Sequence, residues 1–121
     1  MAFTLTTIAP DPLGSTIISD TSVTSTVQVP LTAAHSIYQV HIDNTANAAT
    51  AAYLKIVDAV SGQSAASVDG HRFYCPIGST ATYVIEGGLV MDNGMSYWCV
   101  TGAAVGNTGN PGSAVSIKIL I

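Results

Sequence analysis

The sequence predicts an all-β fold: a single-domain antiparallel β-sandwich, jelly-roll-like, with about seven to nine short strands. Apolar residues alternate with polar ones at a period of two, and no apolar stripe at helical spacing persists along the chain. Clusters of Gly, Pro, Asn and Asp interrupt this alternation at short intervals, as turns between strands do. A chain of 121 residues, 48% of them hydrophobic, is long enough to bury one core.

The first residues differ from the rest. We expect residues 1–14 to form an extended arm and residues 15–121 to form the sandwich domain. The apolar residues of the arm are Phe3, Leu5 and Ile8. The segment Pro10–Pro12 follows them, fixes an extended path and excludes a central strand. A frayed terminus or an ordinary edge strand is the alternative.

Two strands with regular alternation come next. Residues 23–29 place valines on one face and Thr and Gln on the other, until Pro30 removes a ladder donor. Residues 38–43 set Tyr38, Val40 and Ile42 against Gln, His and Asp. Such alternation predicts sheets with one dry and one wet face.

Four further strands are expected after the polar turn at residues 44–49. They cover residues 53–58, 71–75, 80–86 and 95–101. Gly87-Gly88 indicates a turn or bulge, and Asn93-Gly94 favours a tight hairpin because both residues accept positive φ at little cost.

The Gly- and Asn-rich segment 102–112 predicts a surface loop, and a last strand has Val115, Ile117, Ile119 and Ile121 on one face. The period does not encode strand order, so a jelly roll and an immunoglobulin-like sandwich both remain open.

Charge is scarce: the chain has three basic and seven acidic residues and a formal net charge of −4. An ordinary domain has about a quarter charged residues. Three scattered cations cannot neutralise a phosphate track, so we expect no nucleic-acid partner. The longest uncharged stretches contain Asn, His, Gly and Pro, so no membrane span is predicted, and no secretory leader is recognisable. We expect synthesis in a cytoplasm and a surface suited to protein contact.

No motif predicts catalysis. His35, His41 and His71 lack a context that places them beside a nucleophile, so we expect no enzyme and no catalytic residue. His41 and Asp43 share a strand face and could be two ligands of a zinc site, but a third ligand would have to come from another histidine. A wet strand face explains the pair better. No calcium-loop series is present, and we expect no metal and no cofactor.

The chain has two cysteines, Cys75 and Cys99. In a cytoplasm they are expected to be two small buried thiols. The alternative is a disulfide, which neighbouring strands could bring within bonding distance.

Adjacent aromatic residues, Tyr97 and Trp98, should face opposite ways on their strand, so one of them is expected to be exposed. An exposed aromatic could anchor a protein interface or, with Tyr74 and Tyr83, stack against a sugar. The candidate interface residues are Phe3, Leu5, Ile8, Tyr97 and Trp98.

The second half of the chain carries an ordered series of motifs. These are the strand Tyr53–Ala59, a segment around Pro76, Gly87–Met91, Gly94-Met95, a strand ending at Gly102, a Gly/Asn loop, and the strand Val115–Ile121. Over Ala51–Ile121, this order resembles a group of small tailed-bacteriophage head proteins. The shared features are glycines, turns and alternating apolar positions, and no catalytic residue carries over.

The resemblance implies a virion structural protein, a decoration or cement protein of the capsid surface whose partner is the major capsid protein. A scarcely charged surface of short side chains agrees with such a role, because contact then costs little desolvation and little side-chain entropy. We hypothesise a homotrimer, in which several weak contacts form at once, with the arm bridging subunits or adding a strand to a neighbour's open edge. The alternative is a phage tail, fibre or host-recognition module that binds carbohydrate through exposed aromatics.

Overall fold

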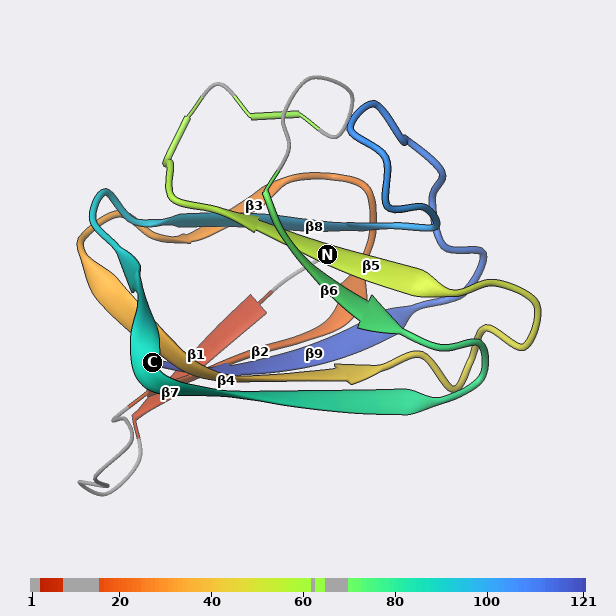
Figure 1. Cartoon of the computed structure of the whole chain (residues 1–121), viewed down its shortest axis with the longest axis horizontal. Coiled ribbons are helices and arrows are strands. Elements are labelled where there is room, and N and C mark those ends of the chain that lie inside the picture. The colour runs from red at the N-terminus through yellow and green to blue at the C-terminus, as the bar shows by residue number, and fades with distance from the viewer. Residues whose placement is uncertain (1–2, 8–15, 62, 65–69) are drawn as a thin grey trace.

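A computed structural model describes residues 3–7, 16–61, 63–64 and 70–121 of the chain. This part of the chain forms nine strands and no helix, which confirms the all-β prediction (Figure 1). The strands are β1 (Phe3–Thr7), β2 (Thr16–Val23), β3 (Gln28–Leu31), β4 (His35–Asp43), β5 (Ala52–Val57), β6 (His71–Cys75), β7 (Thr80–Met91), β8 (Met95–Val100) and β9 (Val115–Leu120).

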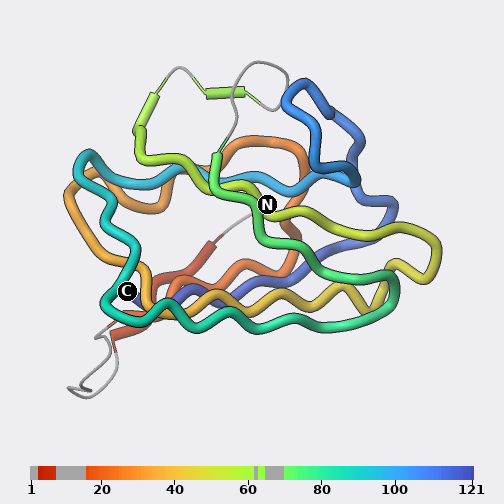
Figure 2. The backbone as a smooth tube through the Cα atoms, viewed as in Figure 1, coloured from red at the N-terminus to blue at the C-terminus, as the bar shows by residue number. Residues whose placement is uncertain are grey.

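The strands form a sandwich of two antiparallel sheets (Figure 2). One has five strands in the order β1-β2-β9-β4-β7, and the other has four in the order β3-β8-β5-β6. From β2 onward the chain pairs as one long rolled hairpin, in which β2 joins β9, β3 joins β8, β4 joins β7 and β5 joins β6. These nested pairs give the strand order of a jelly roll, and β1 extends it at one edge.

The core lies between the inner faces of the two sheets. Val40, Ile117 and Ile119 from one sheet and Leu54 and Ile56 from the other are fully or almost fully buried. In β9, and in β4 from Val40 onward, every second residue is buried, as the alternation predicts. Side chains from both inner faces therefore interdigitate in a single core.

The predicted bulge at Gly87-Gly88 shifts the register of the neighbouring strand. Both glycines have positive φ, 79° and 84°, and β7 continues through them. The β4–β7 register shifts between Ile37 and Gln39, so Ile37 is fully buried and Tyr38 is only half-buried. The expectation that Tyr38 shares the dry face with Val40 is therefore wrong, because the bulge interrupts the period of two.

The predicted tight hairpin connects β7 and β8. Gly94 has φ 133°, and a Cβ atom there would lie 2.5 Å from the carbonyl oxygen of Leu31. The Asp58 carboxylate accepts hydrogen bonds from the backbone N–H groups of Asp92 (2.9 Å) and Asn93 (2.7 Å). The hairpin is thus fixed by a carboxylate from the end of β5.

Acid is expected to weaken this attachment. Hydrogen bonds from Asn93 and Asp92 lower the pKa of Asp58 below its ordinary value. A carboxyl whose pKa is lower in the folded state stabilises the fold above its unfolded pKa and loses that contribution as pH falls through the folded pKa. Urea unfolding at a series of pH values from about 5 to 2 should show a shallower loss of stability in Asp58→Asn than in the natural chain. Equal slopes in the two proteins would contradict this role of Asp58.

The two cysteines are free and buried, as predicted. They lie on β6 and β8, and β5 runs between these strands. Strands two places apart are separated by about 10 Å, which exceeds the reach of a disulfide. Burial raises the pKa of both thiols, that of Cys99 to about 12. The disulfide alternative is therefore wrong.

The N-terminal segment extends the five-stranded sheet over residues 3–7, which pair with β2 in continuous register from Phe3 to Thr7. Residues 3–7 thus form an edge strand, the predicted alternative to an extended arm. Ile8 and Pro10–Pro12 lie outside the described residues, and an arm that bridges subunits stays a prediction.

Candidate protein interface

The outer face of the four-stranded sheet is covered over β8 and over Lys55 of β5, whereas β6 at its edge is exposed. All six residues of β8 are buried, so this strand is enclosed on both faces. The outward side chains of Trp98 and Val100 form a second apolar cluster with Val27, Tyr53 and Val57. Residues 58–61, which follow β5, and the loop that follows β8 lie on this side of the sandwich (Figure 1).

Two cations hold the loop between β8 and β9 (residues 101–114) over this face. The Lys55 ammonium group is fully buried and donates to the carbonyl oxygen of Ala104 at 2.7 Å. The Arg72 guanidinium group donates to the carbonyl oxygen of Ala103 at 3.0 Å. Carbonyl oxygens thus accept hydrogen bonds from two of the three basic side chains.

The far end of the same loop is held by asparagines. Asn47 exchanges hydrogen bonds with the backbone of Ser113, at 3.0 Å through its Nδ2 and 2.8 Å through its Oδ1. The Ser25 N–H donates to Asn110 Oδ1 at 2.9 Å. The predicted surface loop is therefore attached to the sandwich near both of its ends by side-chain hydrogen bonds.

Neither of the two predicted aromatic anchors lies at the surface. Tyr97 points into the core, where its hydroxyl donates to Asp20 Oδ2 at 2.5 Å, and burial raises its pKa. Trp98 points outward, as the alternation requires, but is fully buried in the second apolar cluster. The expectation that one of the two is exposed is wrong, because β8 is buried on both faces.

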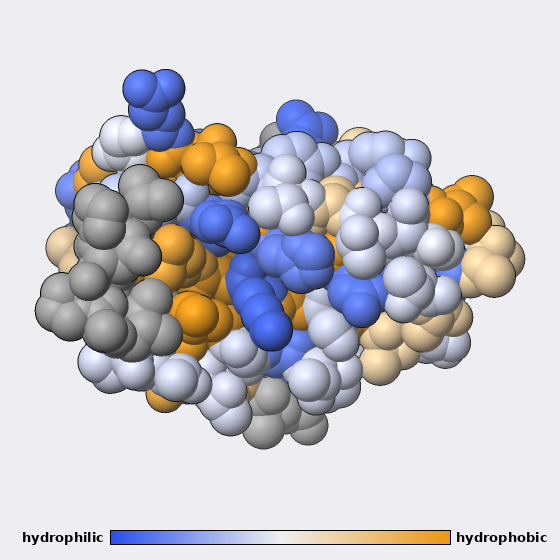
Figure 3. Space-filling view, turned by 90° about the horizontal axis from the view of Figure 1, so that it is seen from below, coloured by the Kyte–Doolittle hydropathy of each residue, from blue (hydrophilic) through white to orange (hydrophobic). Residues whose placement is uncertain are grey.

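The outer face of the five-stranded sheet is open. Register places side chains on it in two rows that cross the sheet. One row is Thr6, Ile17, Leu120, Gln39 and Val84, and the other is Thr4, Ser19, Lys118, His41 and Thr82. We call these ten residues the open face. Figure 3 looks onto it and shows hydrophilic side chains near the middle, with a hydrophobic patch to their left.

Two shallow hollows lie on the open face. The larger, of about 240 Å³, is lined by Ile17, Gln39, His41, Lys118 and Leu120. The smaller, of about 160 Å³, is lined by Ser19, Thr21, His41, Asp43, Ser116, Ile117 and Lys118. Lys118 is exposed between them, and His41 contacts Thr82 Oγ1 through Nδ1 at 2.7 Å. The face is therefore shallowly hollowed, and Lys118 is the charged residue of its two rows, with Asp43 beside them in the smaller hollow.

The alternative prediction, a zinc site at His41 and Asp43, would need a third ligand. Within the described residues, no three His, Cys, Asp or Glu side chains are grouped as metal ligands. Asp43 instead accepts two hydrogen bonds from Thr45, through its N–H at 2.9 Å and its hydroxyl at 2.6 Å, and these lower its pKa. The Asp43 carboxylate thus stabilises the turn that begins at Thr45.

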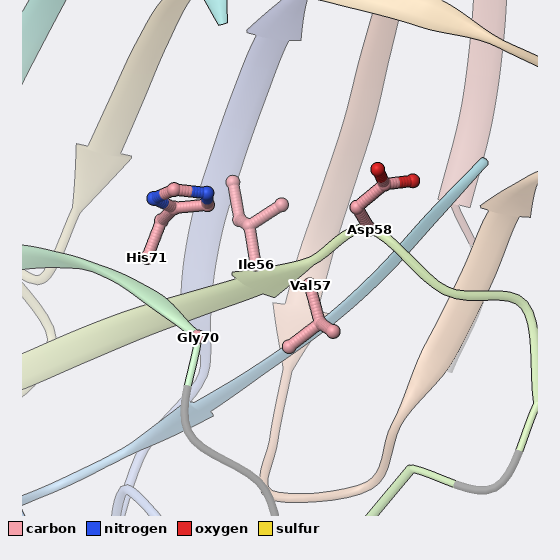
Figure 4. A pocket seen from close by; sticks show the side chains of 5 residues that line it. All are labelled: Ile56, Val57, Asp58, Gly70 and His71. Carbon is pink, nitrogen blue, oxygen red and sulfur yellow. The ribbon is translucent and has the colours of Figure 1, made fainter. Parts of the chain in front are cut away.

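A third hollow, of about 310 Å³, lies where β5 ends and β6 begins. Its described lining residues are Ile56, Val57, Asp58, Gly70 and His71. The side chains of His71 and Asp58 rise on one side of the strand, with Ile56 between them (Figure 4). Because the Asp58 carboxylate accepts two backbone hydrogen bonds from the hairpin, it is poorly suited to transfer protons to His71.

The remaining predicted interface residues lie on β1. Phe3 is half-buried against the core, Leu5 has 46% of its surface exposed, and Ile8 lies outside the described residues. Sequence reasoning missed the apolar members of the open face: Ile17, Leu120 and Val84. The signal was an apolar residue directly beside a core position, such as Ile17 next to Ile18 and Leu120 next to Ile119.

Comparison with protein-family models, with curated proteins and with solved structures finds no match to this chain. The described part of the chain contains no helix long and apolar enough to cross a membrane. Because it is accessible, hollowed and partly apolar, the open face is the strongest candidate site that the geometry offers.

Proposed function

We propose that the protein is a virion structural protein, a decoration or cement protein that binds the major capsid protein of a tailed bacteriophage through its open face. The observation that carries this proposal is the difference between the two sheets. One outer face is covered over β8, on the side where Lys55 and Arg72 hold a loop, whereas the other is left accessible and partly apolar, with Lys118 and Asp43 among mostly uncharged side chains. A protein that acts by lying flat against other proteins needs such a surface.

The chemistry of the open face supports a contact that gains strength from repetition. Thr, Ser and aliphatic side chains lose little rotamer entropy and little charge hydration when they are covered. Each contact would be weak, and an oligomer that makes several contacts at once would bind through avidity. The homotrimer suggested by the sequence fits this requirement, and native mass spectrometry would test it. On this proposal the protein is made in the host cytoplasm, ends on the capsid surface and is not an enzyme.

A host-recognition module that binds carbohydrate is the second candidate. Burial of Tyr97 and Trp98 takes away the aromatics first expected to serve it. One observation still favours it: Tyr74 is 44% exposed and its ring lies 5.2 Å from that of Tyr53 on the outer face of the four-stranded sheet. A glycan array would reveal such binding, and Tyr74→Ala would abolish it.

Replacing Val84 with lysine is expected to weaken binding to bare phage heads at least tenfold. Val84 is 66% exposed on the open face, so the fold tolerates the change, but the contact would then have to desolvate a new charge. The measurement is co-sedimentation with heads of the encoding phage assembled without this protein.

The matched control is Val105→Lys. Val105 is 46% exposed on the loop that covers the other sheet, so the change adds the same charge on the opposite side of the molecule. This variant should bind like the natural chain. Equal weakening by both substitutions would show that the open face has no special part in binding.

A further inference from the structure

The two sheets have four edge strands, and three carry devices that discourage pairing with another chain. β3 is four residues long, contains Pro30 and has an irregular register. β6 carries Arg72, and β7 contains Glu86 and the bulge at Gly87-Gly88. Charges, prolines and bulges are the usual protection of a sheet edge.

The fourth edge strand, β1, has none of these devices. Its sequence is Phe-Thr-Leu-Thr-Thr, without charge or proline, and its pairing with β2 has no register shift. Residues 4–7 are exposed, Leu5 by 46%. Among the described strands, β1 has a neighbour on one side only.

Hydrogen bonds on β2 show which backbone groups of β1 face outward. Thr16 and Ile121 exchange both of their backbone hydrogen bonds, at 3.1 and 2.9 Å, so the groups of Thr16 point away from β1. Successive residues of a strand direct these groups to opposite sides, so Ile17 and Ser19 point toward β1 and pair with Thr6 and Thr4. The N–H and C=O groups of Phe3, Leu5 and Thr7 therefore point to the free edge.

This arrangement is complementary to itself. If a second β1 runs antiparallel with Leu5 opposite Leu5, Phe3 lies opposite Thr7 and Thr4 lies opposite Thr6. Every outward-pointing residue then meets another, which allows about six backbone hydrogen bonds. The exposed side chain of Leu5 packs against its copy on the core side, Thr meets Thr on the outer side, and no charges oppose each other.

We propose that β1 is a self-association edge, at which two copies of this chain pair antiparallel about a two-fold axis at Leu5 and join their five-stranded sheets into one. The pairing does not depend on binding to capsids. Five-residue strands bury less than the roughly 1,000 Å² of a stable interface, so the association should be weak, reversible and, because it is uncharged, insensitive to salt.

A charge exchange at residue 5 tests this pairing. Sedimentation velocity of the natural chain over a range of concentrations should show a reversible doubling of mass. Leu5→Lys and Leu5→Glu should each abolish the doubling, because like charges would then lie directly opposite. An equimolar mixture of the two variants should recover the doubled species, as Lys would meet Glu.

Thr4→Lys is the matched control, since residue 4 faces Thr6 of the other copy and not itself, and this variant should still double. Circular dichroism of each variant alone would show that its fold is kept. Recovery in the mixture cannot come from a change in folding. A natural chain that never doubles, or a mixture that keeps the mass of its separate components, would overturn the proposal.

Discussion

Replacing Trp98 with alanine is expected to lower the free energy of unfolding by about 3–5 kcal/mol. Trp98 is fully buried on the outer face of β8, where it fills the second apolar cluster with Val27, Tyr53 and Val57. Removing its ring leaves a cavity between side chains of β8 and β5, whose backbones are held by sheet pairing, so the site cannot collapse freely. Stability would then fall by the lost burial and by the cavity together.

Urea unfolding followed by circular dichroism is the suitable measurement, because the substitution removes the only tryptophan of the chain. Trp98→Phe should cost much less, since it keeps most of the apolar volume and removes an Nε1 atom that has no hydrogen-bond partner among the described residues. A loss below about 1 kcal/mol in Trp98→Ala would show that the outer face is not a second packed layer.

Tyr97→Phe is expected to cost about 3 kcal/mol, because it removes a donor from a buried carboxylate. Asp20 has 1% of its surface exposed and accepts hydrogen bonds from the Tyr97 hydroxyl at 2.5 Å and the Ser22 N–H at 2.9 Å. The pair connects β8 of one sheet to β2 of the other across the core. Without the hydroxyl, the carboxylate would remain desolvated with one partner fewer.

A double-mutant cycle separates this interaction from the packing of the ring. Asp20→Ala alone should also be destabilising, because it leaves the Tyr97 hydroxyl buried without its acceptor. In the double variant the second substitution should cost little, with a coupling energy of about 1–3 kcal/mol. Additive losses would mean that the two side chains are buried close together without supporting each other.

Local patterns predicted several strands and turns correctly, but the strand expected over residues 23–29 is wrong, because β2 ends at Val23 and β3 begins only at Gln28. The alternation in β9 and in the second half of β4 correctly predicts strands with one buried face. Asn93-Gly94 correctly predicts a turn, in which Gly94 has positive φ. The order of the strands could not be predicted from such patterns. β2 and β9 pair although they lie at opposite ends of the domain sequence, and a period of two does not indicate which strand pairs with which.

The candidate site was predicted less well, for two physical reasons. Alternation indicates which way Trp98 points, but it does not reveal that Val27, Tyr53 and Val57 pack against it on the outer face. Lys55 reads in sequence as a solvated charge, yet the carbonyl oxygen of Ala104 allows it to be buried. The apolar residues of the open face, such as Leu120, lie at positions where alternation predicts polar residues. Apolar residues at such positions distinguish a sheet that makes contacts on both faces from a sheet with one solvent-exposed polar face.

The most direct test of the proposed function is to add the purified protein to bare heads of the encoding phage. If the open face binds the major capsid protein, the number of bound copies should rise to saturation, and the saturated heads should be disrupted at a higher temperature than bare ones. Heads that bind no protein, or that bind it without any rise in their disruption temperature, would contradict the proposal that this jelly roll is a capsid cement protein.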